Sequence, residues 1–334
     1  MSVTLKDIAN ELGISTNAVS RALRGMPDIG EKTKALVIET AKRMGYRKNL
    51  AASCLKTARS MTVGVVIPDI CNPVFSYIYK GIEAYCAEKS YTLMLGNSNE
   101  SSETEDTVLD NMIAHSVDGI VIVPCDKDKP YGEKLDAAGI PFVILQRKSE
   151  HKTSFVQTSD YEGGYLAAKH LAELGHRSFM LVFPSMSISS AGDRYNGFIA
   201  YLTENGISAS TIHVLECDST RGGAKEAMLE HLGKNGGRPA VDAIFCFSDY
   251  VASGVYSALA EFSVKIPEDI SVIGYDNDEF CDILSPALTT VDIRPRKLGN
   301  RAAALLMKEI ISGKSNSVTE EIISPKLIIR KSTR

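Results

Sequence analysis

From Met61 onward, apolar runs of strand length alternate with amphipathic stretches of helix length. The first series predicts buried parallel strands over 63–68, 92–96, 119–124 and 142–146, with helices over 73–89, 103–115 and 131–138 between them. A second series predicts strands over 179–183, 212–216, 243–247 and 271–274, with helices over 161–174, 194–205, 221–232 and 249–262. A last strand is expected over 326–330. Repeated βα units in this number predict two doubly wound parallel sheets.

The first 45 residues follow a different pattern, that of three short helices. Leu5, Ile8, Ala9 and Leu12 share one face of a first helix. Thr4 with Asp7 forms a capping-box start, Gly13 ends the helix, and the Ser15 hydroxyl can cap a second helix. A third helix is expected over 31–44. The predicted head is small, and its stability would be marginal by itself.

The second helix has an outward face suited to DNA. Val19, Ala22 and Leu23 would point inward, while the remaining positions carry hydrogen-bonding or cationic side chains and no acid. Amides and guanidinium groups can read base edges in the major groove. The alternative is an ordinary helical hairpin at the start of a larger domain. The outward residues are Thr16, Asn17, Ser20, Arg21 and Arg24.

Charge is divided unevenly along the chain. Residues 1–60 hold 11 Lys and Arg against 5 Asp and Glu, a net charge of +6; the whole chain carries −4, so the other 274 residues carry −10. A basic segment on an acidic body is typical of a DNA-binding head joined to a domain with another task. A basic surface that is merely solvated is the alternative.

Several function classes lack support in the sequence. The apolar runs are too short to span a bilayer, the N-terminus is too polar for a secretory signal, and the seven scattered cysteines lack C-x-x-C spacing. A cytoplasmic protein without disulfides, metal or cofactor is therefore expected. No P-loop, G-x-G-x-x-G, G-x-S-x-G or H-E-x-x-H motif is found, so the sequence does not indicate an enzyme.

The predicted strands end in polar residues, and ligands of such sheets bind at the carboxyl ends of the strands. Acceptors, amides and a few aromatic rings suit a polyhydroxylated ligand. The same residue types are also common as helix caps and loop formers. The residues at these ends are Asp69, Asn72, Phe75, Asn97, Ser98, Gln146, Arg147, Ser159, Asp160, Ser248, Asp249, Asp276 and Asn277.

Motifs along essentially the whole chain resemble the lac repressor (LacI/GalR) family of bacterial transcription regulators. They are TLKDIANELGIS, AVSRAL, the MGY at 44–46, VGVVIPDICNPVF, DGIVIVP, DRYNGF and ISVIGYDN followed by LTTV. The resemblance implies a homodimer whose helix-turn-helix heads bind a pseudo-palindromic operator. It also implies a periplasmic-binding-protein-like core of two α/β subdomains. The implied divisions are a head over 1–47, a hinge over 48–60, an N-subdomain over 61–159 and 291–320, and a C-subdomain over 160–290 and 321–334.

The resemblance also implies roles for individual residues. Base and phosphate contacts are expected from Thr4, Ser15, Thr16, Asn17, Ser20, Arg21 and Asn49, and Leu55 matches a hinge leucine that enters the minor groove. Arg194 and Asp276 match an effector-anchoring pair. Phe75 would pack against the effector, and Asn72, Gln146 and Ser248 would supply polar contacts.

The chain departs from the family pattern at three places. Lys48 stands where proline is usual before the hinge, Ser248 is shorter than the usual Asn or Thr, and no leucine heptad follows the core. A tetramer is therefore not expected. A sugar-like effector is favoured, as inducer or corepressor. A purine effector, control by a phosphoprotein co-regulator, and a sugar-binding or sugar-modifying module without regulatory role are the alternatives.

Overall fold

The computed structural model describes residues 3–47, 59–126, 129–313 and 318–334. The chain divides into two compact units, residues 1–60 and residues 61–334. The first unit contains helices α1 (Leu5–Leu12), α2 (Thr16–Leu23) and α3 (Glu31–Arg43). Their inner faces meet around Ile8, Val19 and Val37, which are fully buried. The three predicted helices are therefore present.

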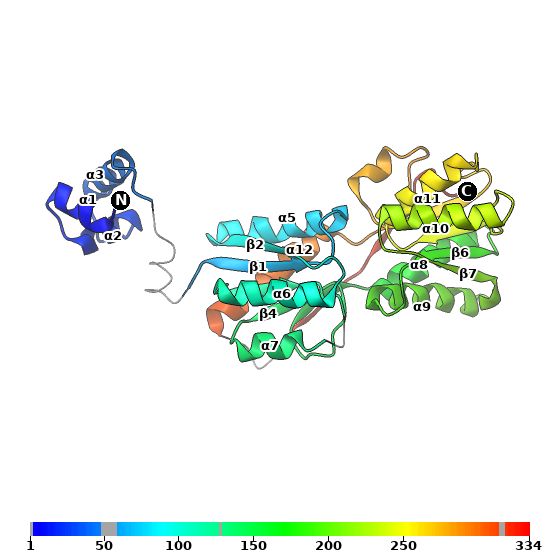
Figure 1. The fold of residues 1–334 in the computed structure, drawn as a ribbon, viewed down its shortest axis with the longest axis horizontal. Helices are drawn as coiled ribbons and strands as arrows, with labels where there is room; N and C mark the ends of the chain where they lie inside the picture. The colour runs from blue at the N-terminus through cyan, green and yellow to red at the C-terminus, as the bar shows by residue number, and fades with distance from the viewer. Residues whose placement is uncertain (1–2, 48–58, 127–128, 314–317) are drawn as a thin grey trace. The chain divides into compact units, whose positions relative to one another are not determined.

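The second unit begins with a six-stranded sheet ordered β11-β5-β4-β3-β1-β2, in which every pair is parallel. Figure 1 shows helices α5, α6, α7 and α12 beside it. Its strands are β1 (Thr62–Ile67), β2 (Thr92–Asn97), β3 (Gly119–Ile122), β4 (Phe142–Leu145), β5 (Phe155–Thr158) and β11 (Glu320–Ile323). Its helices are α5 (Pro73–Glu88), α6 (Ser102–Ala114), α7 (Tyr131–Ala137) and α12 (Pro295–Ser312).

A second six-stranded sheet, ordered β12-β10-β9-β8-β6-β7, is parallel except for the antiparallel pair β10 and β12. Its strands are β6 (Phe179–Phe183), β7 (Ile212–Glu216), β8 (Ala243–Cys246), β9 (Ser271–Asp276), β10 (Thr289–Asp292) and β12 (Lys326–Ile328). Its helices are α8 (Asp160–Glu173), α9 (Ser189–Glu204), α10 (Arg221–Lys234) and α11 (Asp249–Glu261), with short 3-10 turns η1 (Ala209–Thr211) and η2 (Glu279–Asp282). The predicted fold class of a helical head and two α/β subdomains is confirmed.

Two of the expected crossings between the sheets need correction. Strand β10 still belongs to the second sheet, so the chain crosses after Asp292 and not at 291. Strand β11 pairs with β5 of the first sheet, so the last crossing follows Ile323 and not Glu320. Both differences have one reason. The sheet to which a strand belongs is set by its hydrogen-bonded neighbour, and the sequence pattern does not show that neighbour.

Edge strands were also interpreted wrongly. Strand β2, expected to be buried, is mostly half-buried or exposed because it has a neighbour on one side only, and the same holds for β7 at the edge of the other sheet. Strand β5 was not predicted, since only its alternate residues are buried. Helix α9 starts five residues before the expected position 194. No helix among the described residues is long and apolar enough to cross a membrane.

A glycine contact brings helices α8 and α9 close together. A Cβ built on Gly164 would lie 2.0 Å from the Arg194 carbonyl oxygen, and one on Gly197 would lie 1.9 Å from the Tyr161 carbonyl oxygen. Only glycine leaves room for two backbones at this distance. The close crossing places Arg194 of α9 beside Asp160, the first residue of α8.

Candidate functional sites

The first candidate site is the outward face of α2 in the N-terminal unit. Thr4 caps α1 in a complete capping box with Asp7, and Gly13 ends that helix in the left-handed region. The Ser15 hydroxyl accepts the Ala18 N–H at 3.1 Å and so caps α2. Thr16 and Asn17 are exposed at the start of α2, where they are free to meet a base edge.

Arg21 and Ser20 lie further along α2 and are half-buried. The Arg21 Nη2 atom lies 2.5 Å from Asp28 Oδ2, and the two side chains are 40% and 48% exposed. The Arg21 Nε atom is buried and has no hydrogen-bond partner among the described residues. The Arg21 guanidinium donates a hydrogen bond to the Asp28 carboxylate and so lowers the pKa of Asp28. Asn49 and Leu55 lie outside the described residues.

The second candidate site is a cavity between the two sheets of the second unit. Its volume is about 30 Å³, which is room for one or two water molecules. The order of strands reverses between β1 and β3 in one sheet and between β6 and β8 in the other, the usual place for a ligand in such folds. Asp69, Asn72, Val74, Phe75, Ile78, Glu100, Val123, Gln146, Arg147, Ser190, Arg194, Ser219, Phe247, Asp276 and Ile293 line the cavity.

Arg194 is held in the cavity by two hydrogen bonds and two aromatic rings. Its Nε atom donates to Asp160 Oδ1 at 2.8 Å, and its Nη1 atom donates to the carbonyl oxygen of Phe247. Its guanidinium carbon lies 3.5 Å from the centre of the Tyr275 ring and 4.5 Å from that of Phe247. Cation–π contacts of this kind are strongest where water is excluded. Arg194 is therefore held by its own subdomain before any ligand arrives.

Arg194 and Asp276 do line the same cavity, as predicted, but the ion-pair partner of Arg194 is Asp160. In the described part of the chain the Asp276 carboxylate accepts no hydrogen bond. Burial raises the pKa of Asp276 well above its ordinary value, and the nearby Arg194 charge opposes that rise. Burial also raises the pKa of Asp160, with the same opposition from Arg194. Asp276 thus offers the cavity a carboxylate that no hydrogen bond among the described residues uses.

Three other predicted effector residues lie in the cavity. Phe75 supplies an aromatic face, and the Asn72 side chain caps α5 by accepting the Val74 N–H at 3.3 Å. Gln146 accepts the Thr158 N–H at 3.0 Å through Oε1, while its Nε2 is buried without a partner among the described residues. Ser248 does not line the cavity, because its hydroxyl accepts the Val251 N–H and caps α11.

Phe247 and Tyr275, the two rings that flank Arg194, were not among the predicted site residues. Phe247 was expected as the last residue of the strand 243–247, and Tyr275 directly followed the expected strand 271–274. Phe247 directly follows β8 at its carboxyl end, a position that could have pointed to the cavity. In the structure Tyr275 lies within β9, which runs to Asp276, and it is fully buried.

A polar bridge joins the two subdomains beside the cavity. Lys148, shortly after β4, donates its backbone N–H to the hydroxyl of Ser189 at 3.0 Å. The Lys148 Nζ atom lies 2.6 Å from Asp193 Oδ2. Ser189 and Asp193 belong to α9 of the other subdomain. The bridge is thus a polar contact between the two subdomains.

Comparison with known proteins identifies the family. Residues 4–49 match the model of bacterial regulatory proteins of the lacI family, and residues 168–333 match a periplasmic binding protein-like domain. The HTH-type transcriptional repressor PurR of Pasteurella multocida is 31% identical over 333 residues, covering 99% of this chain and 98% of that protein. PurR of a Yersinia pestis strain is 32% identical and covers 98% of this chain and 96% of that protein.

Two solved structures have the same fold over all or most of the chain. The lac repressor dimer bound to operator and the anti-inducer ONPF is 26% identical with a TM-score of 0.85, covering 100% of this chain and 99% of that one. A LacI family regulator from Enterococcus faecium with bound ribose is 32% identical with a TM-score of 0.74, covering 81% of this chain and 98% of that one. The relatives are DNA-binding transcriptional repressors and not enzymes. This chain belongs to the lacI family of bacterial regulatory proteins.

Proposed function

We propose that this chain is a dimeric repressor that binds a pseudo-palindromic operator through α2 and changes its DNA affinity when a small effector binds between the core subdomains. The unpaired Asp276 carboxylate in the cavity carries the proposal. A buried carboxylate without donors is costly, and a ligand that supplies them would be bound preferentially. Action on chromosomal DNA would place the protein in the cytoplasm.

The chemistry of the cavity favours a sugar-like effector. Asp276 needs donors, and the buried Gln146 Nε2 needs an acceptor. A hydroxyl group can serve as both, so a ligand with several hydroxyls satisfies both needs at once. Phe75 and Phe247 add aromatic surface for the ring of the ligand. The ribose bound to the Enterococcus faecium regulator supports a pentose as the first ligand to test.

A purine is the second candidate, because the full-length relatives are named PurR. A ring N–H could donate to Asp276, and a planar base could stack on Phe75 or Phe247. The alternative of a phosphoprotein co-regulator predicts that small ligands alone barely change DNA affinity. The sugar, purine and phosphoprotein alternatives can therefore be compared by the change in DNA affinity that each small ligand causes.

The DNA contacts are proposed from the exposed start of α2. Thr16 and Asn17 would reach base edges, and Arg21 would contact a base or a phosphate one turn later. Thr4, Ser15 and Ser20 would hydrogen-bond the backbone of the DNA. Asn49 and Leu55 keep their expected hinge roles as predictions. The lac repressor dimer on its operator supports a dimer here, since two heads would match two half-sites.

The test uses the full chain in two steps. Selection from a randomised duplex pool gives an operator, and a melting-temperature screen then compares ribose, other sugars, sugar phosphates, hypoxanthine and guanine. The ligand that raises the melting temperature is expected to change operator affinity 5-fold to 150-fold, about 1 to 3 kcal/mol of coupling. The Asp276→Ala chain should bind operator normally and lose the response. If no ligand changes operator affinity, effector control is excluded.

A further inference from the structure

The turn after β9 holds its backbone in an uncommon conformation. Asp276 has a φ of +112° and Asn277 a φ of +59°, so two consecutive residues with side chains lie at positive φ. Asparagine tolerates the left-handed region, but +112° is unfavourable for aspartate. Such residues persist only where the surroundings hold them. The groups that hold this turn therefore determine where the Asp276 carboxylate lies.

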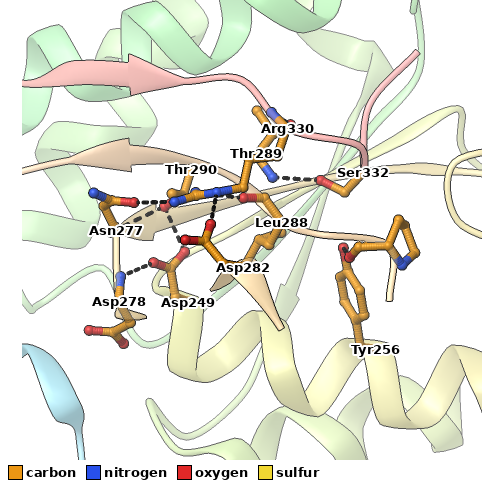
Figure 2. Close-up of polar contacts among 11 residues, drawn as sticks. Asp249, Tyr256, Asn277, Asp278, Asp282, Leu288, Thr289, Thr290, Arg330 and Ser332 are labelled. Carbon is orange, nitrogen blue, oxygen red and sulfur yellow. Dashed lines mark hydrogen bonds and ion pairs between the residues drawn. The ribbon is translucent and has the colours of Figure 1, made fainter. Parts of the chain in front are cut away.

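Asp249, the first residue of α11, holds the turn from one side (Figure 2). It is fully buried, and its Oδ2 atom accepts the Asp278 N–H at 2.8 Å. Its Oδ1 atom accepts the Thr290 hydroxyl at 2.7 Å. A Cβ on Gly274 would lie 2.1 Å from the same Oδ1, so glycine in β9 leaves room for this carboxylate. The Thr290 hydroxyl oxygen in turn accepts the Asn277 N–H at 3.3 Å.

Arg330, two residues after β12, holds the turn from the other side. Its Nη2 atom donates to Asn277 Oδ1 at 2.8 Å, and its Nη1 atom donates to the Leu288 carbonyl oxygen at 2.9 Å. Its Nε atom lies 2.5 Å from Asp282 Oδ1. All three guanidinium nitrogens are thus used within one loop region, as Figure 2 shows. Neither Arg330 nor Asp249 lines the cavity.

We propose that Asp249 and Arg330 are positioning residues of the effector site. They are 81 positions apart in sequence, yet they hydrogen-bond consecutive residues of one turn: Arg330 contacts Asn277, and Asp249 contacts Asp278. These hydrogen bonds hold the strained backbone in place, and that backbone places the Asp276 carboxylate in the cavity. The inference rests on the proposed role of Asp276 in effector binding.

Arg330 could instead serve only to anchor the C-terminal segment, and Asn277 separates the two roles. If Arg330 positions the turn, its contact with the Asn277 side chain matters. If it only anchors the C-terminal segment, its contacts with Asp282 and the Leu288 carbonyl are sufficient. Asn277→Gly removes the acceptor and keeps positive φ without strain. Asn277→Asp keeps the acceptor. In a double-mutant cycle, the effects of Arg330→Ala and Asn277→Gly on ligand affinity should be non-additive only if Arg330 acts through Asn277.

The first readout needs no ligand. Hydrogen exchange of the Asn277 and Asp278 amides in the full chain is expected to be at least 10-fold faster in Arg330→Ala. Arg330→Lys is a milder variant in case the alanine chain does not fold. Arg301→Ala is the control, because Arg301 also forms a bidentate pair, with Glu321, away from this turn. Unchanged exchange in both Arg330 variants, or an equal effect in the control, would overturn the proposal.

The second readout is calorimetric titration with ribose and with hypoxanthine. Arg330→Ala and Asn277→Gly are expected to weaken binding of the ligand that the unmodified chain accepts by about 10-fold, and Asn277→Asp is expected to retain it. Faster exchange with unchanged ligand affinity would make the role structural and refute positioning. If the unmodified chain binds neither ligand but does respond to another from the screen, that ligand is titrated. If none binds, the effector function fails, and with it the positioning role, while the exchange data still show whether the turn is held.

Discussion

Arg194 donates to Asp160 at 2.8 Å, while Asp276 in the same cavity keeps an unpaired carboxylate. The pair joins the first residue of α8 to the second turn of α9. Both side chains are 4% exposed, so each charge depends on the other. Ligand binding can therefore use Asp276 without breaking the pair that holds Arg194.

Removing the Asp160 carboxylate should destabilise the chain strongly. Asp160→Ala leaves the buried Arg194 charge without an anionic partner, which typically costs about 3 to 5 kcal/mol. Chemical denaturation of the core would measure the loss. The control is Glu321→Ala, which breaks the exposed pair with Arg301 and should cost about 0 to 1 kcal/mol. Equal losses in the two variants would mean that the buried pair has no special role.

Asp28 should weaken DNA binding through its pairing with Arg21. Arg21 has to leave Asp28 before it can contact a base or phosphate, and the Asp28 carboxylate repels phosphate. Asp28→Asn is expected to raise affinity for the selected operator, whereas Arg21→Ala should lower it by about 1 to 3 kcal/mol. Fluorescence anisotropy at several salt concentrations measures both. Unchanged binding of Arg21→Ala would refute the assignment of α2 as the recognition helix.

Asp278 should make stability depend on pH. Its carboxylate is 1% exposed and lacks partners among the described residues. Burial, with the nearby Asp249 charge, raises its pKa from 3.8 to about 8. The folded chain therefore binds this proton more tightly than the unfolded chain, and the stabilisation present below pH 3.8 is lost as the pH rises through about 8.

Asp278→Asn removes the charge and keeps the shape of the side chain. It is expected to raise the free energy of unfolding by about 1 to 3 kcal/mol at pH 9, with a much smaller change at pH 5. Glu226→Gln on the exposed face of α10 is the matched control and should change neither value. Denaturant unfolding at the two pH values measures the difference. An equal effect of Asp278→Asn at both would show that the carboxyl does not titrate there.

The Lys148 bridge should favour the narrow cleft. Lys148→Glu removes the attraction to Asp193 and is expected to weaken binding of the effector found by the melting screen by about 2-fold to 5-fold, as for a partly exposed pair. The exchanged pair Lys148→Glu with Asp193→Lys should recover most of the affinity. Lys80→Ala, which breaks a pair within α5, is the control. Failure of the exchanged pair to recover would argue against a charge-based bridge.

Local signals were enough to predict the head and most of the core. The Thr4 and Ser15 caps appear as expected, and β6 and β7 have the expected bounds, because caps and apolar runs act over a few residues. The family resemblance pointed to Arg194, Asp276 and Phe75 as effector residues, and all three line one cavity. The partner of Arg194 could not be predicted, because it depends on how closely α8 and α9 cross at Gly164 and Gly197.

The misplaced Ser248 has a similar cause. A serine after a strand can either cap the next helix or face a ligand, and the sequence alone does not distinguish the two. In the structure its hydroxyl accepts the Val251 N–H, and Ser248 does not line the cavity. The Asp249 and Arg330 contacts were equally hidden, since they join residues far apart in sequence.

The cavity of about 30 Å³ has a kinetic consequence. A pentose is several times larger than the one or two water molecules that fit there, so it cannot enter the cleft in this form. Association must then wait for the subdomains to separate. The observed binding rate should level off at high ligand concentration, and its plateau would equal the opening rate of the cleft in the absence of ligand. The rate at which such a repressor responds to its effector would then be limited by the opening rate of its own cleft.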